Sequence, residues 1–255
     1  IASDDKVLTC INVEDLKDEE YAKNHFIMMA TRNGVVKKTS LESYSRPRAN
    51  GIIALGIREG DELLEAKLTT GKSQVVLALK SGRAIRFEEE KVRSMGRTAS
   101  GVRGVTLAGP DDEVIGMICV DQPETTVLVV SENGYGKRTD IDDYRITNRG
   151  GKGVTTLKIS DKTGSLIAIK AVDDSNDLMI INKKGITIRL AIESLRVMGR
   201  ATQGVRLINM KGKNDQIAAV AKVPHSDEEE LEAPDVEGST DTQENTETDG
   251  SSAQE

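Results

Sequence analysis

Short apolar runs recur along the chain, and each is followed by a glycine-containing turn and a second run. Four such segments align at residues 26–44, 75–92, 127–144 and 178–195, with turn glycines at Gly34, Gly82, Gly134 and Gly185. Successive turn glycines are 48, 52 and 51 residues apart. Asn-Gly and similar pairs suit a two-residue hairpin turn whose backbone needs positive φ. Each segment therefore predicts a β-hairpin.

A second apolar pattern accompanies the hairpins. It occurs five times, at residues 4–13, 61–70, 111–120, 163–172 and 214–223. The hairpin runs are apolar at successive positions, as in residues 127–130, whereas a sheet that is open to water on one side would alternate. Four strands in each ~50-residue repeat are typical of propeller blades. A helical solenoid is less favoured, because the runs are short, β-branched and bounded by turns.

We therefore predict an all-β fold, a β-pinwheel or propeller-like repeat of four-stranded blades over residues 1–225. Its four units cover about 1–57, 58–109, 110–161 and 162–210, with a closing strand at 215–223. The first and last recognisable strands are of the same type, and a ring of blades can close by sharing strands between its ends. We therefore expect further blades upstream of Ile1.

The net charge of −7 conceals a division of the chain. Residues 226–255 hold 12 of the 42 acidic residues and none of the 35 basic ones, which leaves 35 basic against 30 acidic residues in 1–225. The C-terminal segment has almost no large apolar side chains, so we predict a disordered acidic tail. A basic body with an acidic tail suggests a polyanionic partner and a competitor for it. A solubilising terminus is the other interpretation.

The basic residues of the body recur at fixed distances from the turn glycines. Position +4 after the glycine is Lys38, Arg86, Arg138 or Arg189, position +11 is Arg93, Arg145 or Arg196, and position +15 is Arg97, Arg149 or Arg200. A closing glycine follows at +19, as Gly101, Gly153 or Gly204, while the shorter first unit offers Arg46 and Arg48 before Gly51. Because blades are related by rotation, each position becomes a ring of positive charge. Such a ring matches a phosphate backbone without sequence readout, and arginine grips phosphate oxygens in a bidentate way.

The sequence favours duplex DNA over a single strand. Four Tyr, two Phe and no Trp offer little material for stacking unpaired bases. The predicted DNA-contacting residues are Lys37, Lys38, Arg46, Arg48, Arg86, Arg93, Arg97, Arg103, Lys137, Arg138, Arg145, Arg149, Lys152, Arg189, Arg196, Arg200 and Arg206.

Two alternatives remain open for these positions. The +4 residues could instead pair with acids on neighbouring strands, for which residues 88–90 and 140–143 are candidates. The closing glycines could let backbone amides approach phosphates, or could simply permit a tight turn.

The stretch at 92–105 has the glycine spacing of a nucleotide-binding P-loop. Val102 and Arg103, however, follow Gly101 where that loop needs Lys and Ser or Thr. The same spacing returns at Gly199 and Gly204. A nucleotide site would not be needed once per blade, so we interpret the loop as part of a surface that follows DNA.

We predict no catalytic site and no metal site in this chain. His25 and His225 lie in no ligand-like cluster, and no CxxC, HExxH or GxSxG motif occurs. Tyr44 and Tyr144 occupy position +10, which is aliphatic in the other units. They are therefore predicted to pack in the core and not to act as nucleophiles.

The cysteines and the hydropathy favour a cytoplasmic protein. Cys10 and Cys119 lie in apolar runs and are predicted to be small core residues. No apolar run reaches the ~18 residues of a membrane span, and no basic-then-apolar leader opens the chain.

Several phrases closely resemble the C-terminal domain of the DNA gyrase A subunit. They are VRSMGRTASGVRG at 92–104, NGYGKRTDIDDY at 133–144, NRGGKGV at 148–154 and VMGRATQGV at 197–205. The resemblance covers about residues 1–223, and the acidic tail also looks like the end of that family. It implies a β-pinwheel, normally of six blades, whose basic edge wraps duplex DNA. The wrap presents a second DNA segment, in a positive crossing, for strand passage that introduces negative supercoils.

The resemblance also implies what lies outside this chain. The chain is then a non-catalytic part of an ATP-dependent type II topoisomerase, with the catalytic tyrosine in the upstream part of the A subunit. No cofactor is expected in this chain, because ATP and Mg²⁺ act elsewhere in the holoenzyme. The implied partners are duplex DNA, the B subunit, and the rest of the A subunit, in an A2B2 complex.

The sequence departs from the family at its defining motif, the gyrase box Q-R-R-G-G-K-G of the first blade. The sequence has TNRGGKG at 147–153, in the third unit, and the box-like loop comprises Asn148, Arg149, Gly150, Gly151, Lys152 and Gly153. Either this loop is secondary and the true box lies upstream, or the box has moved. The family pattern favours the first reading.

Two other functions stay open at this point. The equivalent domain of topoisomerase IV has fewer blades and wraps DNA weakly. A protein-interaction propeller is the alternative from another class. A WD array would need tryptophan, which is absent, and a kelch array would need a Gly-Gly pair in each blade, whereas this chain has one.

Overall fold

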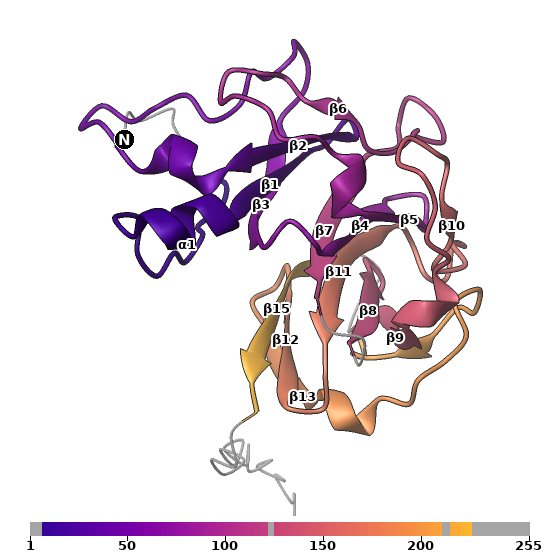
Figure 1. The fold of residues 1–255 in the computed structure, drawn as a ribbon. Helices are drawn as coiled ribbons and strands as arrows, with labels where there is room; N and C mark the ends of the chain where they lie inside the picture. Colours follow the sequence, from indigo (N-terminus) through magenta and orange to yellow (C-terminus); the bar gives the residue numbers. More distant parts are fainter. Residues whose placement is uncertain (1–6, 122–124, 211–214, 226–255) are drawn as a thin grey trace, which may run out of the picture. The chain divides into compact units, whose positions relative to one another are not determined.

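The strands of the computed structural model, which describes residues 7–121, 125–210 and 215–225, form four antiparallel sheets (Figure 1). The first sheet has the order β3 (Leu63–Thr69), β1 (Phe26–Thr31), β2 (Val35–Ser40), β6 (Val102–Arg103). The second has the order β10 (Val154–Thr155), β5 (Arg83–Glu88), β4 (Gln74–Leu79), β7 (Val114–Val120). The third has the order β11 (Leu166–Val172), β8 (Thr126–Ser131), β9 (Tyr135–Asp140), β14 (Val205–Arg206). The fourth has three strands in the described residues, β13 (Thr187–Ala191), β12 (Asn176–Asn182) and β15 (Ile217–Pro224). The predicted acidic tail at 226–255 lies outside the described residues.

The four hairpins form as predicted, with one difference at their turns. The turn glycines have φ values of +81°, +77°, +80° and +84° in chain order, which confirms the need for positive φ. Three residues, however, separate β1 from β2, and the Gly34 N–H donates to the Thr31 carbonyl at 3.1 Å. The prediction of a two-residue connection is therefore wrong. A turn closed by a left-handed glycine provides the same reversal with one more residue.

The sheets are offset from the repeat units of the sequence. In the first sheet, β1 pairs with β3 and β2 pairs with β6, although β3 and β6 belong to the second unit. The same relation holds for β7 in the second sheet and for β10. Each sheet thus combines the hairpin of one unit with edge strands from the next.

One predicted strand does not form. Residues 7–13, the described part of the first copy of the second pattern, form no strand. The copies at β3, β7 and β11 each pair with the hairpin of the preceding unit. Cys10 is consequently exposed, so the prediction that it is a core residue is wrong. Among the described residues, the fourth sheet has no short outer strand.

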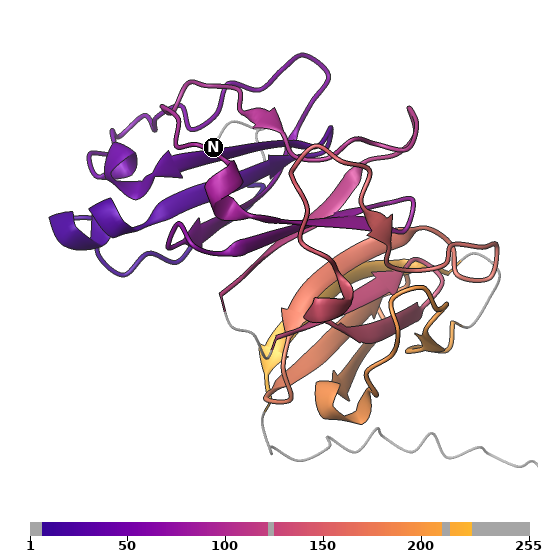
Figure 2. The ribbon, with the colours of Figure 1, turned by 45° about the vertical axis from the view of Figure 1, so that its right-hand side comes forward.

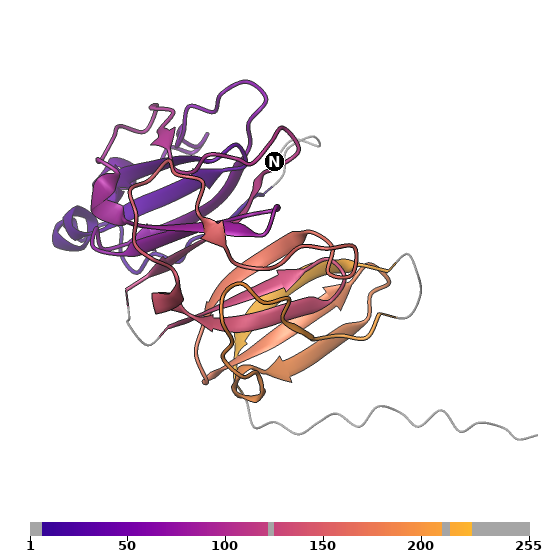
Figure 3. The ribbon, with the colours of Figure 1, turned by 90° about the vertical axis from the view of Figure 1, so that its right-hand side faces the viewer.

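The hairpin strands are apolar at successive positions because both faces of a sheet are covered. Val75 and Leu77 of β4 are buried in the cluster shared with the first sheet, whereas Val76 and Ala78 are buried in the cluster shared with the third. In the same way, the third sheet shares a buried cluster with the fourth. Figures 2 and 3 show this series from two further sides, with the indigo strands of the first sheet and the orange strands of the last at its two ends.

Short helices complete the units. A 3-10 helix follows the second strand of each hairpin, and the four are η1 (Leu41–Tyr44), η2 (Glu89–Lys91), η3 (Ile141–Asp143) and η4 (Ile192–Ser194). Tyr144 directly follows η3 and is fully buried, which confirms its predicted packing role. Tyr44 is half-buried.

A single α-helix lies before the first hairpin. In helix α1 (Glu19–Asn24), the side chain of Asp18 caps the N-terminus by accepting from two backbone N–H groups. Tyr21 of this helix packs with Ile11 against a cluster that includes Ile27 and Met29 of the first sheet. In the described part of the chain, no helix combines the length and the apolar character that crossing a membrane would need.

The closing glycines are explained by close approach between units. A Cβ on Gly101, Gly153 or Gly204 would lie 2.5, 2.3 or 2.3 Å from the carbonyl oxygen of Val36, Ala84 or Gly136, respectively. Each of these carbonyls lies at position +2 of the preceding unit. All three glycines also have positive φ. The positive φ supports the tight-turn interpretation of these glycines. The close approach to a neighbouring strand is a second reason why no side chain fits there.

We predict that Gly153→Ala destabilises the protein more than Gly185→Ala. Both residues have positive φ, so either substitution should cost about 1–2 kcal/mol. A Cβ at Gly185 would meet no atom within 4 Å, whereas at position 153 the overlap with the Ala84 carbonyl should add roughly 1–3 kcal/mol. Urea denaturation of the two variants and the wild type measures the difference. Equal losses would contradict the close-approach explanation.

Candidate nucleic-acid interface

Three loops carry most of the predicted contact residues. They cover residues 93–101, 145–153 and 196–204, and we call them the arginine loops. Each is tied to a hairpin strand of the preceding unit by one parallel bridge, in the pairs Lys38–Ser94, Arg86–Ile146 and Arg138–Val197. The next N–H of each loop donates to the +4 carbonyl, at 2.8 Å from Met95 to Lys38, 2.9 Å from Thr147 to Arg86 and 2.8 Å from Met198 to Arg138. The +4 residue therefore anchors the loop of the following unit through its backbone.

The side chains at +4 are buried in three of the four units. Lys38, Arg86 and Arg138 are each 7% exposed. The guanidinium of Arg86 donates to the carbonyl oxygens of Ile141 at 2.6 Å and Tyr144 at 3.0 Å. This guanidinium thus bonds the protein's own backbone. A contact between the three residues and DNA stays a prediction, and their burial does not favour it.

Acidic partners account for the buried +4 charges, as the open alternative held. The pairs are Lys38 Nζ with Glu89 Oε1 at 3.9 Å, Arg86 Nη1 with Asp142 Oδ1 at 3.5 Å, and Arg138 Nη1 with Asp174 Oδ1 at 2.5 Å. Glu89 and Asp142 fall within the two predicted acidic stretches. Arg189, the fourth +4 residue, pairs with Asp177 at 2.6 Å but keeps 41% of its side chain exposed.

The predicted contacts Lys37 and Lys137 are also buried, which does not favour a direct contact with DNA. Their side chains are 1% and 0% exposed. Lys37 Nζ donates to the carbonyl oxygens of Ala54, at 2.7 Å, and of Arg97. Burial and the Arg97 guanidinium lower the pKa of the Lys37 ammonium to about 8. Both lysines lie one residue before +4 on the opposite face of the strand, and that face is covered by the next arginine loop.

The +15 arginines lie half-buried at the base of their loops. Arg149 donates from Nε to the Lys91 carbonyl and from Nη1 to the Arg103 carbonyl, both at 3.0 Å. Arg200 makes the equivalent contacts with the carbonyls of Asp143 at 3.1 Å and Thr155 at 2.8 Å. Arg97 has one weak contact, with the Ile53 carbonyl at 3.4 Å. Position +15 thus ties each loop back to the unit before it.

Seven of the predicted contact residues have side chains that are free to meet a phosphate. Among the described residues, their side chains are exposed and have no hydrogen-bond or ion-pair partner: Arg46, Arg48, Arg93, Arg103, Arg145, Lys152 and Arg196. Three of the seven occupy position +11, one in each arginine loop. Because the backbone of each loop is fixed one residue later by the parallel bridge, these three charges have equivalent placements.

Arg206 is exposed but has partners. Its Nη2 donates to the Tyr135 hydroxyl at 2.9 Å, and its guanidinium lies over the same ring, 5.5 Å from the centroid. Lys162 lies over that ring as well, at 5.2 Å. The hydrogen bond from Arg206 lowers the pKa of Tyr135.

The box-like loop is held by residues that sequence analysis missed. Arg83 donates to the carbonyls of Lys152 at 2.9 Å and Gly153 at 2.6 Å. Thr106 donates from its hydroxyl to the Gly150 carbonyl at 2.7 Å and from its N–H to the Gly151 carbonyl at 2.9 Å. Arg83 is basic at +1 in one unit alone, so the repeat gave no signal for it. A hollow of about 260 Å³ borders this loop and is lined by Arg145, Asn148 and Lys152 among others.

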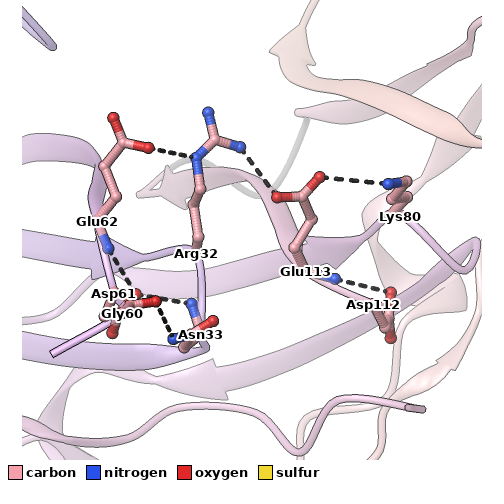
Figure 4. Close-up of polar contacts among 8 residues, drawn as sticks. All are labelled: Arg32, Asn33, Gly60, Asp61, Glu62, Lys80, Asp112 and Glu113. Atoms are coloured by element: carbon pink, nitrogen blue, oxygen red, sulfur yellow. Dashed lines mark hydrogen bonds and ion pairs between the residues drawn. The ribbon is translucent and has the colours of Figure 1, made fainter. Parts of the chain in front are cut away.

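The hairpin turns carry basic residues of a different kind (Figure 4). Arg32 lies between Glu62, at 3.0 Å, and Glu113, at 3.2 Å, and Lys80 lies 3.6 Å from the second carboxylate oxygen of Glu113. These pairs join the first and second sheets. Positive charge at the first two turns is therefore matched by acids, whereas the +11 arginines have none among the described residues. No group of three or more His, Cys, Asp and Glu side chains placed to hold a metal occurs in that part of the chain.

Comparison with known sequences points to one family. A family model described as the DNA gyrase C-terminal domain, beta-propeller, matches residues 25–70, 80–121, 125–173 and 176–224. The DNA gyrase A subunit of Staphylococcus aureus strain NCTC 8325 is 41% identical over 248 residues, which are 97% of this chain and 27% of that protein. Its counterpart in strain MRSA252 is 42% identical over 233 residues, 91% of this chain and 26% of that protein. The chain thus spans about a quarter of the length of these relatives.

Solved structures share the fold. The C-terminal domain of DNA topoisomerase IV has a TM-score of 0.79 at 22% identity, covering 88% of this chain and 68% of that one. A DNA gyrase A C-terminal domain has a TM-score of 0.69 at 24% identity, covering 78% and 66%. These similarities confirm the predicted β-pinwheel architecture. With the family match over most of its length and relatives above 40% identity, the chain belongs to the DNA gyrase C-terminal domain family of β-propellers.

Proposed function

We propose that this chain binds duplex DNA without sequence preference and wraps it along the arginine loops. The observation that carries the proposal is the set of +11 arginines, Arg93, Arg145 and Arg196, which are exposed and have no partner among the described residues. One such charge per unit, on a backbone held in the same way each time, matches the repeating charge of a phosphate backbone. Arg46 and Arg48 provide the counterpart in the first unit.

Duplex DNA fits better than a single strand. None of the six aromatic side chains is exposed: Phe87, Tyr135 and Tyr144 are buried, and Tyr21, Phe26 and Tyr44 are half-buried. Single-strand binders need such rings as stacking platforms. Contacts to phosphates hold a duplex in place without reading its bases.

The energetics of wrapping are consistent with this surface. Bending a 20–30 bp site by 40–90° costs on the order of 1–6 kcal/mol. The seven exposed, unpartnered basic side chains offset that cost through phosphate contacts. Those contacts release counterions, so the affinity should fall steeply as salt rises.

Within the whole enzyme, the proposed role is to present DNA for strand passage. The relatives are DNA gyrase A subunits, and we propose that this chain acts with a B subunit, and with the rest of its own A subunit, in an A2B2 complex. The wrapped segment would then be passed to introduce negative supercoils. Catalysis and the binding of ATP and Mg²⁺ would belong to other parts of the enzyme. The whole complex would act in the cytoplasm. The relatives at 41–42% identity are gyrase A subunits, so the topoisomerase IV alternative is not better supported than the gyrase one.

We expect the triple variant Arg93→Ala, Arg145→Ala, Arg196→Ala to bind duplex DNA more weakly on every sequence. Each lost phosphate contact should lower the slope of log K against log salt by about 0.9, so three should lower it by about 3. Fluorescence anisotropy with two unrelated duplexes across a salt series measures both quantities.

The matched control removes three positive charges at the hairpin turns. Arg32 and Lys80 are paired with acids, and Lys183 bonds Gln216 at 2.5 Å. The variant Arg32→Ala, Lys80→Ala, Lys183→Ala has the same net charge as the first variant but should keep its salt slope. Equal slopes for the two variants would show that net charge, and not the arginine loops, drives binding.

We expect Arg86→Met to affect stability and not the DNA contact. Removing the guanidinium leaves buried carbonyls without a donor, which should lower the free energy of unfolding by about 3 kcal/mol or more. Arg93→Met, at an exposed position, should change it by no more than about 0.5 kcal/mol. Urea denaturation gives the stability, and binding below the unfolding transition gives the salt slope. If Arg86→Met lowered the salt slope of binding and left the stability unchanged, Arg86 would be a DNA contact and not a stabilising residue.

A further inference from the structure

Two buried lysines make no ion pair in the described residues. Lys37 and Lys137 both stand at +3, with exposed fractions of 1% and 0%, and no carboxylate of the described residues lies within ion-pair distance of either. Lysine is almost never fully buried without a partner, because removing an ammonium from water is costly. The structure must therefore gain something from these groups that an apolar side chain would not provide.

The partners of Lys137 all lie in one arginine loop. Its Nζ donates to the carbonyl oxygens of Gly199 at 2.8 Å, Arg200, and Thr202 at 3.2 Å, and contacts the Thr202 hydroxyl at 3.2 Å. An ammonium has three donors and no acceptor, so converging carbonyls suit it. One positive charge thus gathers three backbone carbonyls from four consecutive residues and fixes the course of the loop.

Lys37 holds the arginine loop at 93–101 in a similar way. Its Nζ donates to the Arg97 carbonyl and, at 2.7 Å, to the Ala54 carbonyl. Ala54 belongs to the connection that carries Arg46 and Arg48 in the first unit. This single ammonium therefore joins two segments that bear exposed arginines.

The fold of the strand does not require lysine at +3. Isoleucine stands at the same position in the other two units, as Ile85 and Ile188, and Ile85 is 1% exposed in an equivalent strand. The loop beside Ile85 is held instead by Arg83, which donates to the carbonyls of Lys152 and Gly153. Each arginine loop thus receives one cation from the preceding unit, and the function of lysine at +3 lies in the loop and not in the sheet.

We propose that Lys37 and Lys137 are positioning residues for DNA binding, whose ammonium groups hold the backbone of the arginine loops at 93–101 and 196–204 so that Arg93 and Arg196 face the duplex. This inference rests on the proposed function. The lysines touch no phosphate themselves. Without them the exposed arginines would still be present, but on loops with more than one conformation, and DNA would have to order those loops on binding.

The test is a double-mutant cycle in duplex affinity. Lys137→Ile installs the residue that the chain itself carries at Ile85, and it should weaken binding several-fold. On the Arg196→Ala background, which removes the exposed arginine of the same loop, the loss should be clearly smaller. On the Arg93→Ala background, in another loop, it should be undiminished. Equal losses on both backgrounds would overturn the proposal, because a general loss of structure does not distinguish between loops.

Two controls separate positioning from stability. Leu128→Ala empties a fully buried site between the third and fourth sheets and should destabilise the protein by about 2–5 kcal/mol, yet keep its duplex affinity while folded. If Lys137→Ile does not fold, the mirrored cycle uses Lys37→Ile, whose loss should shrink on the Arg93→Ala background and not on the Arg196→Ala background.

Amide hydrogen exchange without DNA tests the clamp by itself. Lys137→Ile should raise exchange in residues 196–204 and leave residues 145–153 unchanged. If the wild type fails to bind duplex DNA but shows this pattern, the proposed function is wrong and the clamp is right. Unchanged exchange in 196–204 would overturn the clamp.

The pH dependence of duplex affinity separates the role of the ammonium charge from a purely structural role. Burial, followed by the Arg200 guanidinium and opposed by Asp143, lowers the pKa of Lys137 to about 8, and burial with Arg97 lowers the pKa of Lys37 to about 8. Duplex affinity of the wild type should fall as pH rises through about 8, and the fall should be absent in Lys37→Ile, Lys137→Ile. A wild-type fall that persists in the double variant would contradict the role of the ammonium charge.

Stability should change in the opposite direction over the same range. The unfolded lysines keep the ordinary pKa of 10.5, so between about pH 8 and 10.5 the unfolded state binds more protons than the folded state. The free energy of unfolding therefore rises with pH in the wild type, relative to the double isoleucine variant. A falling difference would show that the folded lysines keep their protons.

Discussion

The hydrogen bond from each arginine loop to the +4 carbonyl of the preceding unit is the contact on which the rest of the structure depends. It places residues such as Met95 and Thr147 beside a strand that belongs to another unit. The closing glycine then passes that strand too closely for a Cβ. No unit completes its own sheet, so the loops acquire equivalent positions only when successive units pack together. Because each unit contributes strands and a loop to the sheet of the unit before it, the repeat in the sequence produces a regular arrangement in the structure.

The same contact divides the basic residues into two groups. Cations that face the interior, such as Arg86 and Lys137, are matched by backbone carbonyls or acids and stabilise the junction between units. Cations at position +11 of the arginine loops, such as Arg145 and Arg196, are exposed and unpartnered among the described residues. Burying the first group is what holds the second in place. A single count of basic residues mixes an internal scaffold with an external binding surface.

Period and composition were sufficient to predict the hairpins, the two-sided burial of their strands and the family. They could not separate the two groups of basic residues, because Lys38 and Arg93 both belong to positions that are basic in successive units, although one is buried and the other exposed. The position in the strand contains part of that signal, because Lys37 and Lys137 stand where other units carry isoleucine, which is buried in one of them. The exposure of Cys10 escaped prediction because its apolar run resembles the runs that form strands in the other units, whereas the described part of this run forms none.

The central claim is that the arginine loops bend duplex DNA around the protein and do not merely bind it. Nicked circular DNA is saturated with this chain, sealed by ligase and freed of protein, and its linking number is compared with that of a protein-free control. The account predicts a positive shift that grows with protein concentration to a plateau and is lost in the Arg93→Ala, Arg145→Ala, Arg196→Ala variant. An unchanged linking number at saturating protein would contradict wrapping by this chain.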